Sequence, residues 1–198
     1  MRVRAPRLAV MELPLTTCVV RSWRMGDAEA LARHGDNEKI WINLRDAFPH
    51  PYTVHHAREF IKSLRHRTPE TTFAIAVNGE AAGSVGFVLR NDVERVSAEI
   101  GYWLAEPFWG RGIATEALAA MTQYAIATHG LTRVYALPFA ANTASCRVLE
   151  KAGYLLEGRL RRSAIKNGVI ADQLQYAYVV PDSAPLTAAD PPPPGRRG

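Results

Sequence analysis

The sequence predicts a single mixed α/β domain, in which a mostly antiparallel sheet is flanked by helices. Short β-rich runs follow one another from residue 72 to residue 104, and a helix and a further strand continue the pattern to residue 138. Another helix and two more strands then complete the body. With 198 residues, of which 47% are hydrophobic, the chain suits one core, since a domain usually contains roughly 100 to 200 residues.

The N-terminal part predicts a strand and three helices. The expected elements are a strand at Thr17–Arg21 and helices at Asp27–Arg33, Glu38–Asp46 and Ala57–Arg67. Asp27 is placed to cap the first of these helices, and Gly35 to terminate it. Pro49 and Pro51 enforce a loop before the third helix.

The sequence after residue 71 predicts most of the strands of the sheet and two helices. The expected strands are Thr72–Val77, Ala82–Arg90, Val96–Leu104, Arg133–Pro138, Tyr154–Leu160 and Gln173–Val180, and the expected helices are Thr115–Thr128 and Thr143–Ala152. Asn78-Gly79 joins the first two strands, and this pair is a strong hairpin signal. Three successive antiparallel strands are therefore expected, followed by a crossover helix that Gly130 closes.

The sequences of the two termini predict segments that lie outside the folded domain. Residues 1–14 are expected to form a flexible N-terminal segment, and residues 15–181 to form the domain. Residues 182–198 are expected to form a disordered tail. This tail contains Pro191-Pro192-Pro193-Pro194, which can join neither a sheet ladder nor a helix interior.

The composition argues against a nucleic-acid or membrane partner. The formal net charge is +5, but five of the arginines lie in the two terminal segments, so the body carries too small an excess for a phosphate-tracking surface. No run approaches the ~20 apolar residues of a membrane span, and no signal peptide is recognisable. Cys18 and Cys146 have neither metal-ligand spacing nor a disulfide framework, so a cytoplasmic location is expected.

A glycine-rich loop, Trp109-Gly110-Arg111-Gly112-Ile113-Ala114-Thr115, connects a predicted strand to the long helix. The first amides of a helix lack intrahelical partners and carry a partial positive charge, so a phosphate is the natural ligand there. A Walker A loop would need a lysine, and a dinucleotide fingerprint would need an acid at the end of the next strand. The loop has no lysine and the next predicted strand has no acid, which leaves a different phosphate site or a turn that only allows close packing.

Two motifs in the expected order resemble the GNAT superfamily of N-acetyltransferases. Gly-Arg-Gly-Ile-Ala-Thr-Glu-Ala, at residues 110–117 after the strand Glu99-Ile-Gly-Tyr-Trp-Leu, looks like its motif A, and residues 142–154 look like its motif B. Upstream, residues 43–46 and 48–53 resemble the RimJ/RimL-like branch, the ribosomal-protein-alanine acetyltransferase type. The resemblance implies the GNAT fold, with a splayed parallel strand pair that holds the pantetheine of acetyl-CoA.

The resemblance also implies which residues bind the donor. They are Trp103, Leu104, Trp109, Gly110, Arg111, Gly112, Ile113, Ala114, Thr115, Asn142 and Ser145. Trp109 stands where the superfamily often has Gln or Arg, so the backbone amides must carry more of the phosphate binding. Asn142 also suits a helix cap, and the two roles are compatible.

Acyl transfer requires a neutral amine and a proton for the leaving thiolate. Glu99 is the expected base, acting through ordered water, and Ser145 the expected acid, with Tyr102 as its rival. Cys146 is expected to be a buried helix cysteine, because no histidine pairs with it. Direct transfer in a ternary complex is therefore expected.

The acceptor site is expected in the variable N-terminal half, with Trp41, His50 and Tyr52 as its candidate residues. The acceptor is a primary amine, either of a protein N-terminus or of a small molecule such as a polyamine. No metal is needed, and adjacent His55 and His56 do not face one ion. The alternatives are a non-catalytic acyl-CoA-binding regulatory protein and, less favoured, a nucleic-acid modifier. The oligomeric state stays open, with a homodimer among the alternatives.

Overall fold

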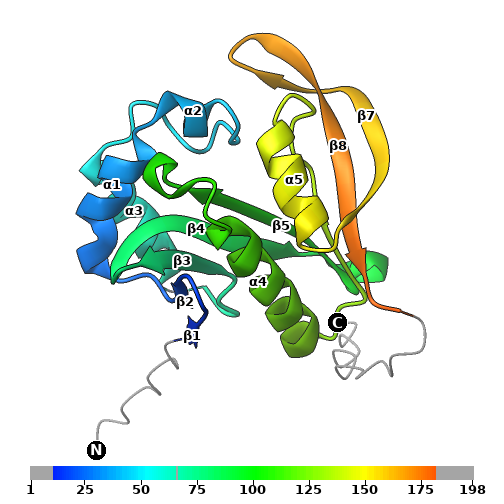
Figure 1. Cartoon of the computed structure of the whole chain (residues 1–198), viewed down its shortest axis with the longest axis horizontal. Helices are drawn as coiled ribbons and strands as arrows, with labels where there is room; N and C mark the ends of the chain where they lie inside the picture. Colours follow the sequence, from blue (N-terminus) through cyan, green and yellow to red (C-terminus); the bar gives the residue numbers. More distant parts are fainter. Residues whose placement is uncertain (1–10, 66, 182–198) are drawn as a thin grey trace, which may run out of the picture.

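The computed structural model describes residues 11–65 and 67–181. These residues form an eight-stranded sheet in the order β1-β2-β3-β4-β5-β6-β8-β7 (Figure 1). The strands are β1 Glu12–Pro14, β2 Val19–Arg21, β3 Thr72–Val77, β4 Glu80–Leu89, β5 Ser97–Leu104, β6 Arg133–Ala136, β7 Leu155–Lys166 and β8 Val169–Val179. The α-helices are α1 Ala28–Gly35, α2 Glu38–Trp41, α3 Val54–Leu64, α4 Ile113–His129 and α5 Thr143–Lys151.

One strand pair separates the two halves of the sheet. β5 and β6 are parallel and are paired only from Ser97–Arg133 to Glu99–Tyr135, although β5 continues to Leu104. The other neighbouring strands are antiparallel. The prediction of a mixed, mostly antiparallel sheet with a splayed parallel pair is confirmed.

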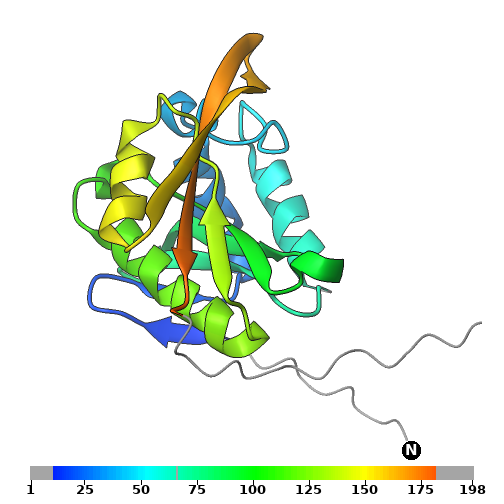
Figure 2. The ribbon, with the colours of Figure 1, turned by 90° about the vertical axis from the view of Figure 1, so that its right-hand side faces the viewer.

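Helices cover both faces of the sheet (Figures 1 and 2). One face packs its buried residues against α4, including Ala98 and Ile100 of β5 together with Leu118 and Met121. A smaller cluster on the other side joins α1 and α3 through Leu31 and similar residues, and Trp103 packs against it. Successive residues of β5 therefore face opposite layers. No helix of the described residues is long and apolar enough to cross a membrane.

The best-predicted elements carry strong local signals. Asn78 and Gly79 both have positive φ, 52° and 84°, as the predicted hairpin turn requires. α4 begins two residues before the predicted start and ends at His129, and the next residue, Gly130, has the left-handed conformation of a helix terminator.

The N-terminal segment differs from its prediction. Residues 1–10 lie outside the described residues, as do residues 182–198, so the structure gives no account of the predicted tail. Glu12–Pro14, however, forms a strand instead of belonging to a flexible segment. Leu13 pairs with Val20 and packs against the core, which supplies the burial that this short strand needs.

Four further elements differ in extent. α2 stops at Trp41 instead of continuing to residue 46, because Arg45 and Asp46 instead bind side chains on β5 and β7. α3 begins at Val54, where the Thr53 hydroxyl accepts a hydrogen bond from the His56 amide. β7 and β8 form a longer hairpin that turns at residues 167 and 168, both with positive φ. This Asn-Gly pair carries the same signal as the predicted hairpin and was missed.

The Asp27 side chain binds Arg21 and does not form the predicted helix cap. Its carboxylate does not cap α1 but accepts hydrogen bonds from the Arg24 amide and, through both oxygens, from the Arg21 guanidinium at 2.8 Å. Arg21 and Asp27 are both buried. A buried guanidinium needs a charged partner. The Asp27 carboxylate, which the sequence assigned to the helix cap, therefore binds Arg21 instead.

Gly83 allows close approach of β4 and β5 beside the separated strands. A Cβ built on Gly83 would lie 2.4 Å from the Trp103 carbonyl oxygen, whereas one on Gly101 would meet nothing within 4 Å. We expect Gly83→Ala to lower the free energy of unfolding by about 1–3 kcal/mol, as overpacking does, and Gly101→Ala to change it by less than about 0.5 kcal/mol. Urea unfolding of both variants tests this, and equal losses would contradict it.

Candidate active site

A continuous groove opens where β5 and β6 separate. Its volume is about 2210 Å³, more than twice the upper end of ordinary ligand pockets, roughly 300 to 1,000 Å³. Its walls come from the segment after α2, from α3, from the N-terminal part of α4, from α5 along its length, and from the end of β7. The groove therefore has room for two ligands at once.

The glycine-rich loop lies at one end of this groove. Gly112 has φ +78° and is the N-cap of α4, and the first intrahelical hydrogen bond runs from the Glu116 amide to the Gly112 carbonyl at 3.0 Å. The amides of Ile113, Ala114 and Thr115 therefore have no acceptor within the helix. All three residues line the groove, so this end suits an anionic ligand.

The two side chains flanking the first motif glycine behave differently. Trp109 lines the groove, and its indole nitrogen donates a hydrogen bond to the Leu104 carbonyl at 2.6 Å. Arg111 does not line the groove, and its guanidinium lies 5.6 Å from the centre of the Phe108 ring. The structure therefore brings Gly110 and residues 112–115 to the groove but leaves Arg111 outside it.

The register of β5 decides which main-chain groups face the open edge. The Ser97 carbonyl accepts from the Arg90 amide, and the Ala105 amide donates to the Ala82 carbonyl, so odd-numbered residues point toward β4. Main-chain groups alternate along an antiparallel strand, so those of Tyr102 and Leu104 point toward β6, beyond its last pair. The register thus favours Leu104 as one of the two predicted main-chain contacts to pantetheine. For the other contact it favours Tyr102 over the predicted Trp103.

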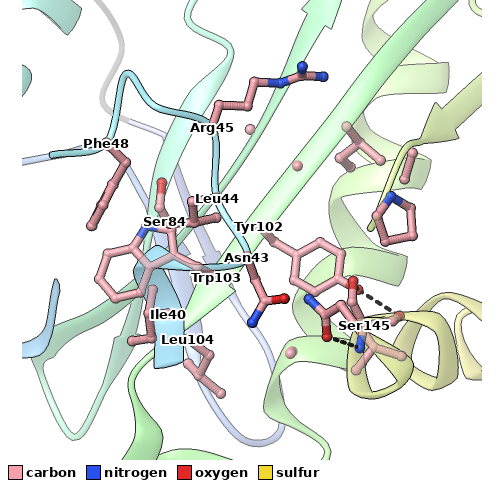
Figure 3. Close-up of a pocket in the computed structure, with 18 of the residues that line it drawn as sticks. Ile40, Asn43, Leu44, Arg45, Phe48, Ser84, Tyr102, Trp103, Leu104 and Ser145 are labelled. Atoms are coloured by element: carbon pink, nitrogen blue, oxygen red, sulfur yellow. Dashed lines mark hydrogen bonds between the residues drawn. The ribbon is translucent and has the colours of Figure 1, made fainter. Parts of the chain in front are cut away.

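Tyr102 and Ser145 form a hydrogen-bonded pair across the groove (Figure 3). The Tyr102 hydroxyl lies 2.9 Å from the Ser145 hydroxyl and donates to the Ser145 carbonyl at 3.1 Å. Burial raises the pKa of Tyr102 above its ordinary value, so the phenol keeps its proton at neutral pH. Asn142 caps α5 by accepting from the Ser145 amide at 3.0 Å, which fixes the serine. The two rival acids of the sequence prediction are thus neighbours.

Cys146, next to Ser145, points into the core. It is buried, and burial raises the pKa of its thiol. The prediction of a buried helix cysteine is confirmed.

Glu99 lies on the groove face of β5 and binds two arginines. Arg45 donates to one carboxylate oxygen, and Arg90 donates to the other at 2.5 Å. The Arg90 guanidinium also donates to the Tyr135 hydroxyl at 2.7 Å. Sequence reasoning proposed Glu99 but missed both arginines, which lie 54 and nine positions away along the chain.

The acceptor residues proposed from the sequence are only partly brought together. Tyr52 lines the groove but is buried against Phe48, and burial raises its pKa to about 12. Trp41 and His50 stack on each other with ring centres 5.3 Å apart and do not line the groove. The structure thus brings Tyr52 to the groove and leaves Trp41 and His50 outside its lining, and an acceptor role for these two residues stays a prediction.

A clasp of Lys166, Asp46 and Trp41 joins the β7–β8 hairpin to the segment after α2. The buried Lys166 ammonium binds the Asp46 carboxylate at 2.9 Å and lies 4.2 Å from the centre of the Trp41 ring. Lys166 lies beyond the predicted end of its strand, so the sequence reading missed it. The clasp holds residues 42–46 over β5, where the groove lining includes Asn43, Leu44 and Arg45 (Figure 3).

Comparisons with known proteins agree with this geometry. A family model described as acetyltransferase (GNAT) domain matches residues 18–155. The uncharacterized N-acetyltransferase YoaA of Bacillus subtilis is 36% identical over 102 residues, which are 52% of this chain and 57% of YoaA. The ribosomal-protein-serine acetyltransferase of Escherichia coli is 31% identical over 119 residues, which are 59% of this chain and 65% of that protein. The chain thus spans less than two thirds of either relative.

Among solved structures, Mycobacterium smegmatis RimJ in complex with CoA-disulfide is similar over most of its length. It is 28% identical to this chain, with a TM-score of 0.75, and the match covers 86% of each chain.

Proposed function

The chain belongs to the acetyltransferase (GNAT) family, in its RimJ/RimL-like branch, and from this we propose that it moves acetyl from acetyl-CoA directly to a primary amine. The α-amine of a polypeptide is the acceptor that the site supports best. One observation carries the proposal: a helix N-terminus, an open strand edge and a hydroxyl pair line the same groove.

The residues present fit acetyl-CoA, which supplies the activated acetyl group when bound. The free amides of Ile113, Ala114 and Thr115 would hold its pyrophosphate. The main-chain groups of Tyr102 and Leu104 would pair with the amide-like pantetheine, as a neighbouring strand would. The groove is large enough to hold an amine acceptor beside this donor.

Removal of a proton from the amine falls to Glu99. A lysine amine with a pKa near 10.4 loses its proton at a cost of about 4 to 5 kcal/mol at pH 7, but an α-amine near 8 costs only about 1 kcal/mol. A carboxylate that accepts the proton through water therefore suffices for an N-terminal acceptor. The two arginines bound to Glu99 fix the orientation of its carboxylate.

The name of one relative supports a polypeptide acceptor. The Escherichia coli relative is named as an enzyme that acts on serine of a ribosomal protein. The small proton cost for an α-amine agrees with this name. A protein N-terminus is thus favoured over a small-molecule amine.

Acetyl-CoA titration together with thiol-release assays tests the proposal. The acceptor panel contains peptides with free and blocked N-termini, spermidine and free amino acids. We expect turnover only where a free amine is present, and most with peptides. Tight acetyl-CoA binding without turnover on any acceptor would instead support a regulatory acyl-CoA-binding protein.

Replacing Glu99 by glutamine is expected to slow transfer most at low pH. At pH 6 an α-amine with a pKa near 8 is almost fully protonated, so loss of the base affects the rate more than at pH 9. We expect kcat/KM to fall about tenfold at pH 7, less than the roughly 10²–10⁴ of a base that contacts its proton directly because Glu99 acts through water, with acetyl-CoA affinity unchanged. Glu157→Gln is the control, because it breaks the ion pair of Glu157 with Arg133, which lies outside the groove. An unchanged pH profile would rule out Glu99 as the base.

A further inference from the structure

Two guanidiniums share one carboxylate on the acceptor side of the groove. Arg45 and Arg90 both bind Glu99, so the cluster of these three side chains carries a net charge of +1. The Glu99 side chain is only 18% exposed, and that of Arg90 is 35% exposed. The Arg45 side chain is 70% exposed. The excess positive charge is therefore presented to the groove mainly by Arg45.

Arg45 keeps donors for a further ligand. A guanidinium has five N–H donors, and Arg45 binds Glu99 through one of its terminal nitrogens. Its planar fork suits a carboxylate, which can accept two of the remaining hydrogen bonds. Figure 3 shows Arg45 above β5, with Tyr102 and Ser145 farther along the groove.

No side chain of the described residues covers the surface of β5 between Glu99 and Trp103, which forms the floor of the groove. Gly101 lies between them on the groove face of β5, and its direct partner on β4 is Gly86. A Cβ on Gly101 would meet nothing within 4 Å, and its backbone does not have the positive φ that favours glycine. Because glycine has no side chain, the groove has room here for an acceptor that extends from the Tyr102–Ser145 pair toward Arg45.

We propose that Arg45 binds a carboxylate of the acceptor, so that the enzyme selects polypeptide N-termini with an acidic residue within their first few positions. This inference rests on the proposed transfer to an α-amine. A net charge of +1 beside the acceptor path attracts an acidic side chain and repels a second ammonium. A polyamine, which carries several ammonium groups, is thus a poor acceptor for this groove.

Synthetic octapeptides test the proposal. Each has a free N-terminal serine and a neutral sequence, except for Glu, Gln or Lys at position 2, 3 or 4. We expect Glu to raise kcat/KM about three- to tenfold over Gln at one of these positions, and Lys to lower it. These modest factors suit a solvent-exposed ion pair, and they should shrink at high salt.

Two variants separate recognition by Arg45 from a general charge effect. In Arg45→Gln the preference for Glu should disappear, whereas Arg58→Gln, an exposed arginine on α3 that does not line the groove, should keep it. Gly101→Leu should lower kcat/KM for every octapeptide about tenfold, because its side chain fills the floor. Acetyl-CoA affinity, measured by titration, should be the same in all three variants.

The outcomes distinguish this inference from the proposed function. Equal turnover of the Glu, Gln and Lys peptides, or a Glu preference that persists in Arg45→Gln, would overturn carboxylate recognition and leave the transferase proposal standing. Acetyl-CoA binding without turnover of any peptide would overturn the proposed function and the inference with it.

Discussion

Replacing Gly112 by valine is expected to weaken acetyl-CoA binding about 100-fold. Gly112 is the N-cap of α4, next to the free amides of residues 113–115, and a Cβ there would meet nothing within 4 Å. That open space is where the pyrophosphate would approach the helix, so valine obstructs it. Losing one charge-assisted hydrogen bond removes about 1.5–3 kcal/mol of binding free energy, and 2.7 kcal/mol corresponds to 100-fold. Calorimetric titration with acetyl-CoA measures the change.

Gly79→Val is the matched control for Gly112→Val. Gly79 also has positive φ, 84°, and its Cβ would likewise meet nothing within 4 Å, but it lies in the β3–β4 turn outside the groove. Both variants force a branched residue into the left-handed region, at about 1–2 kcal/mol of stability. If the two variants have comparable unfolding free energies and only Gly112→Val binds acetyl-CoA more weakly, the lost affinity belongs to the glycine-rich loop. Wild-type affinity in Gly112→Val would refute the phosphate assignment.

The donor side of the site could be predicted because its signals are local. A strand, a glycine-rich loop and a helix follow each other within residues 97–129, so sequence order alone places the amides at the end of β5. The Asn142 cap is equally local, since its acceptor oxygen and the Ser145 amide are three positions apart. The confirmed antiparallel run of β3, β4 and β5 followed from the same short-range turns and periodicity.

The acceptor side depends on contacts between distant parts of the chain. The clasp joins Asp46 to Lys166 across 120 positions, and Arg45 reaches Glu99 across 54. Helix periodicity favoured continuing α2 through residue 46, but these two ion pairs end it at Trp41. No local pattern contains such information, which is why sequence analysis could not place Arg45 in the groove.

The two candidate acids illustrate the same limit. Sequence analysis treats Ser145 and Tyr102 as rivals, because nothing along the chain relates positions 43 residues apart. The register of β5 and the cap of α5 bring their hydroxyls to 2.9 Å. The two candidate acids are therefore hydrogen-bonded neighbours in the groove and not alternatives at separate places.

Tyr102→Phe is expected to lower kcat at least about 100-fold while leaving acetyl-CoA affinity unchanged. We propose that the phenol protonates the leaving thiolate and that Ser145 holds its hydroxyl in place, since a positioned general acid contributes about 10²–10⁴ in rate. Burial raises the pKa of Tyr102 above the ordinary value of 10.0, so the acid stays protonated as the pH rises toward 10. The pH profile of kcat should therefore show no alkaline decline from this group between about pH 6 and 9.

The double variant decides whether the two hydroxyls act as a unit. Ser145→Ala alone should lower kcat about tenfold, because Tyr102 keeps its proton but loses its hydroxyl partner, and the double variant should match Tyr102→Phe. Tyr154→Phe is the control, since it removes a buried hydroxyl bonded to Thr122 at 2.6 Å and should lower thermal stability with kcat unchanged. Rate losses that multiply in the double variant would show that the hydroxyls act independently. A larger loss in Ser145→Ala than in Tyr102→Phe would make the serine the acid, as the resemblance alone implied.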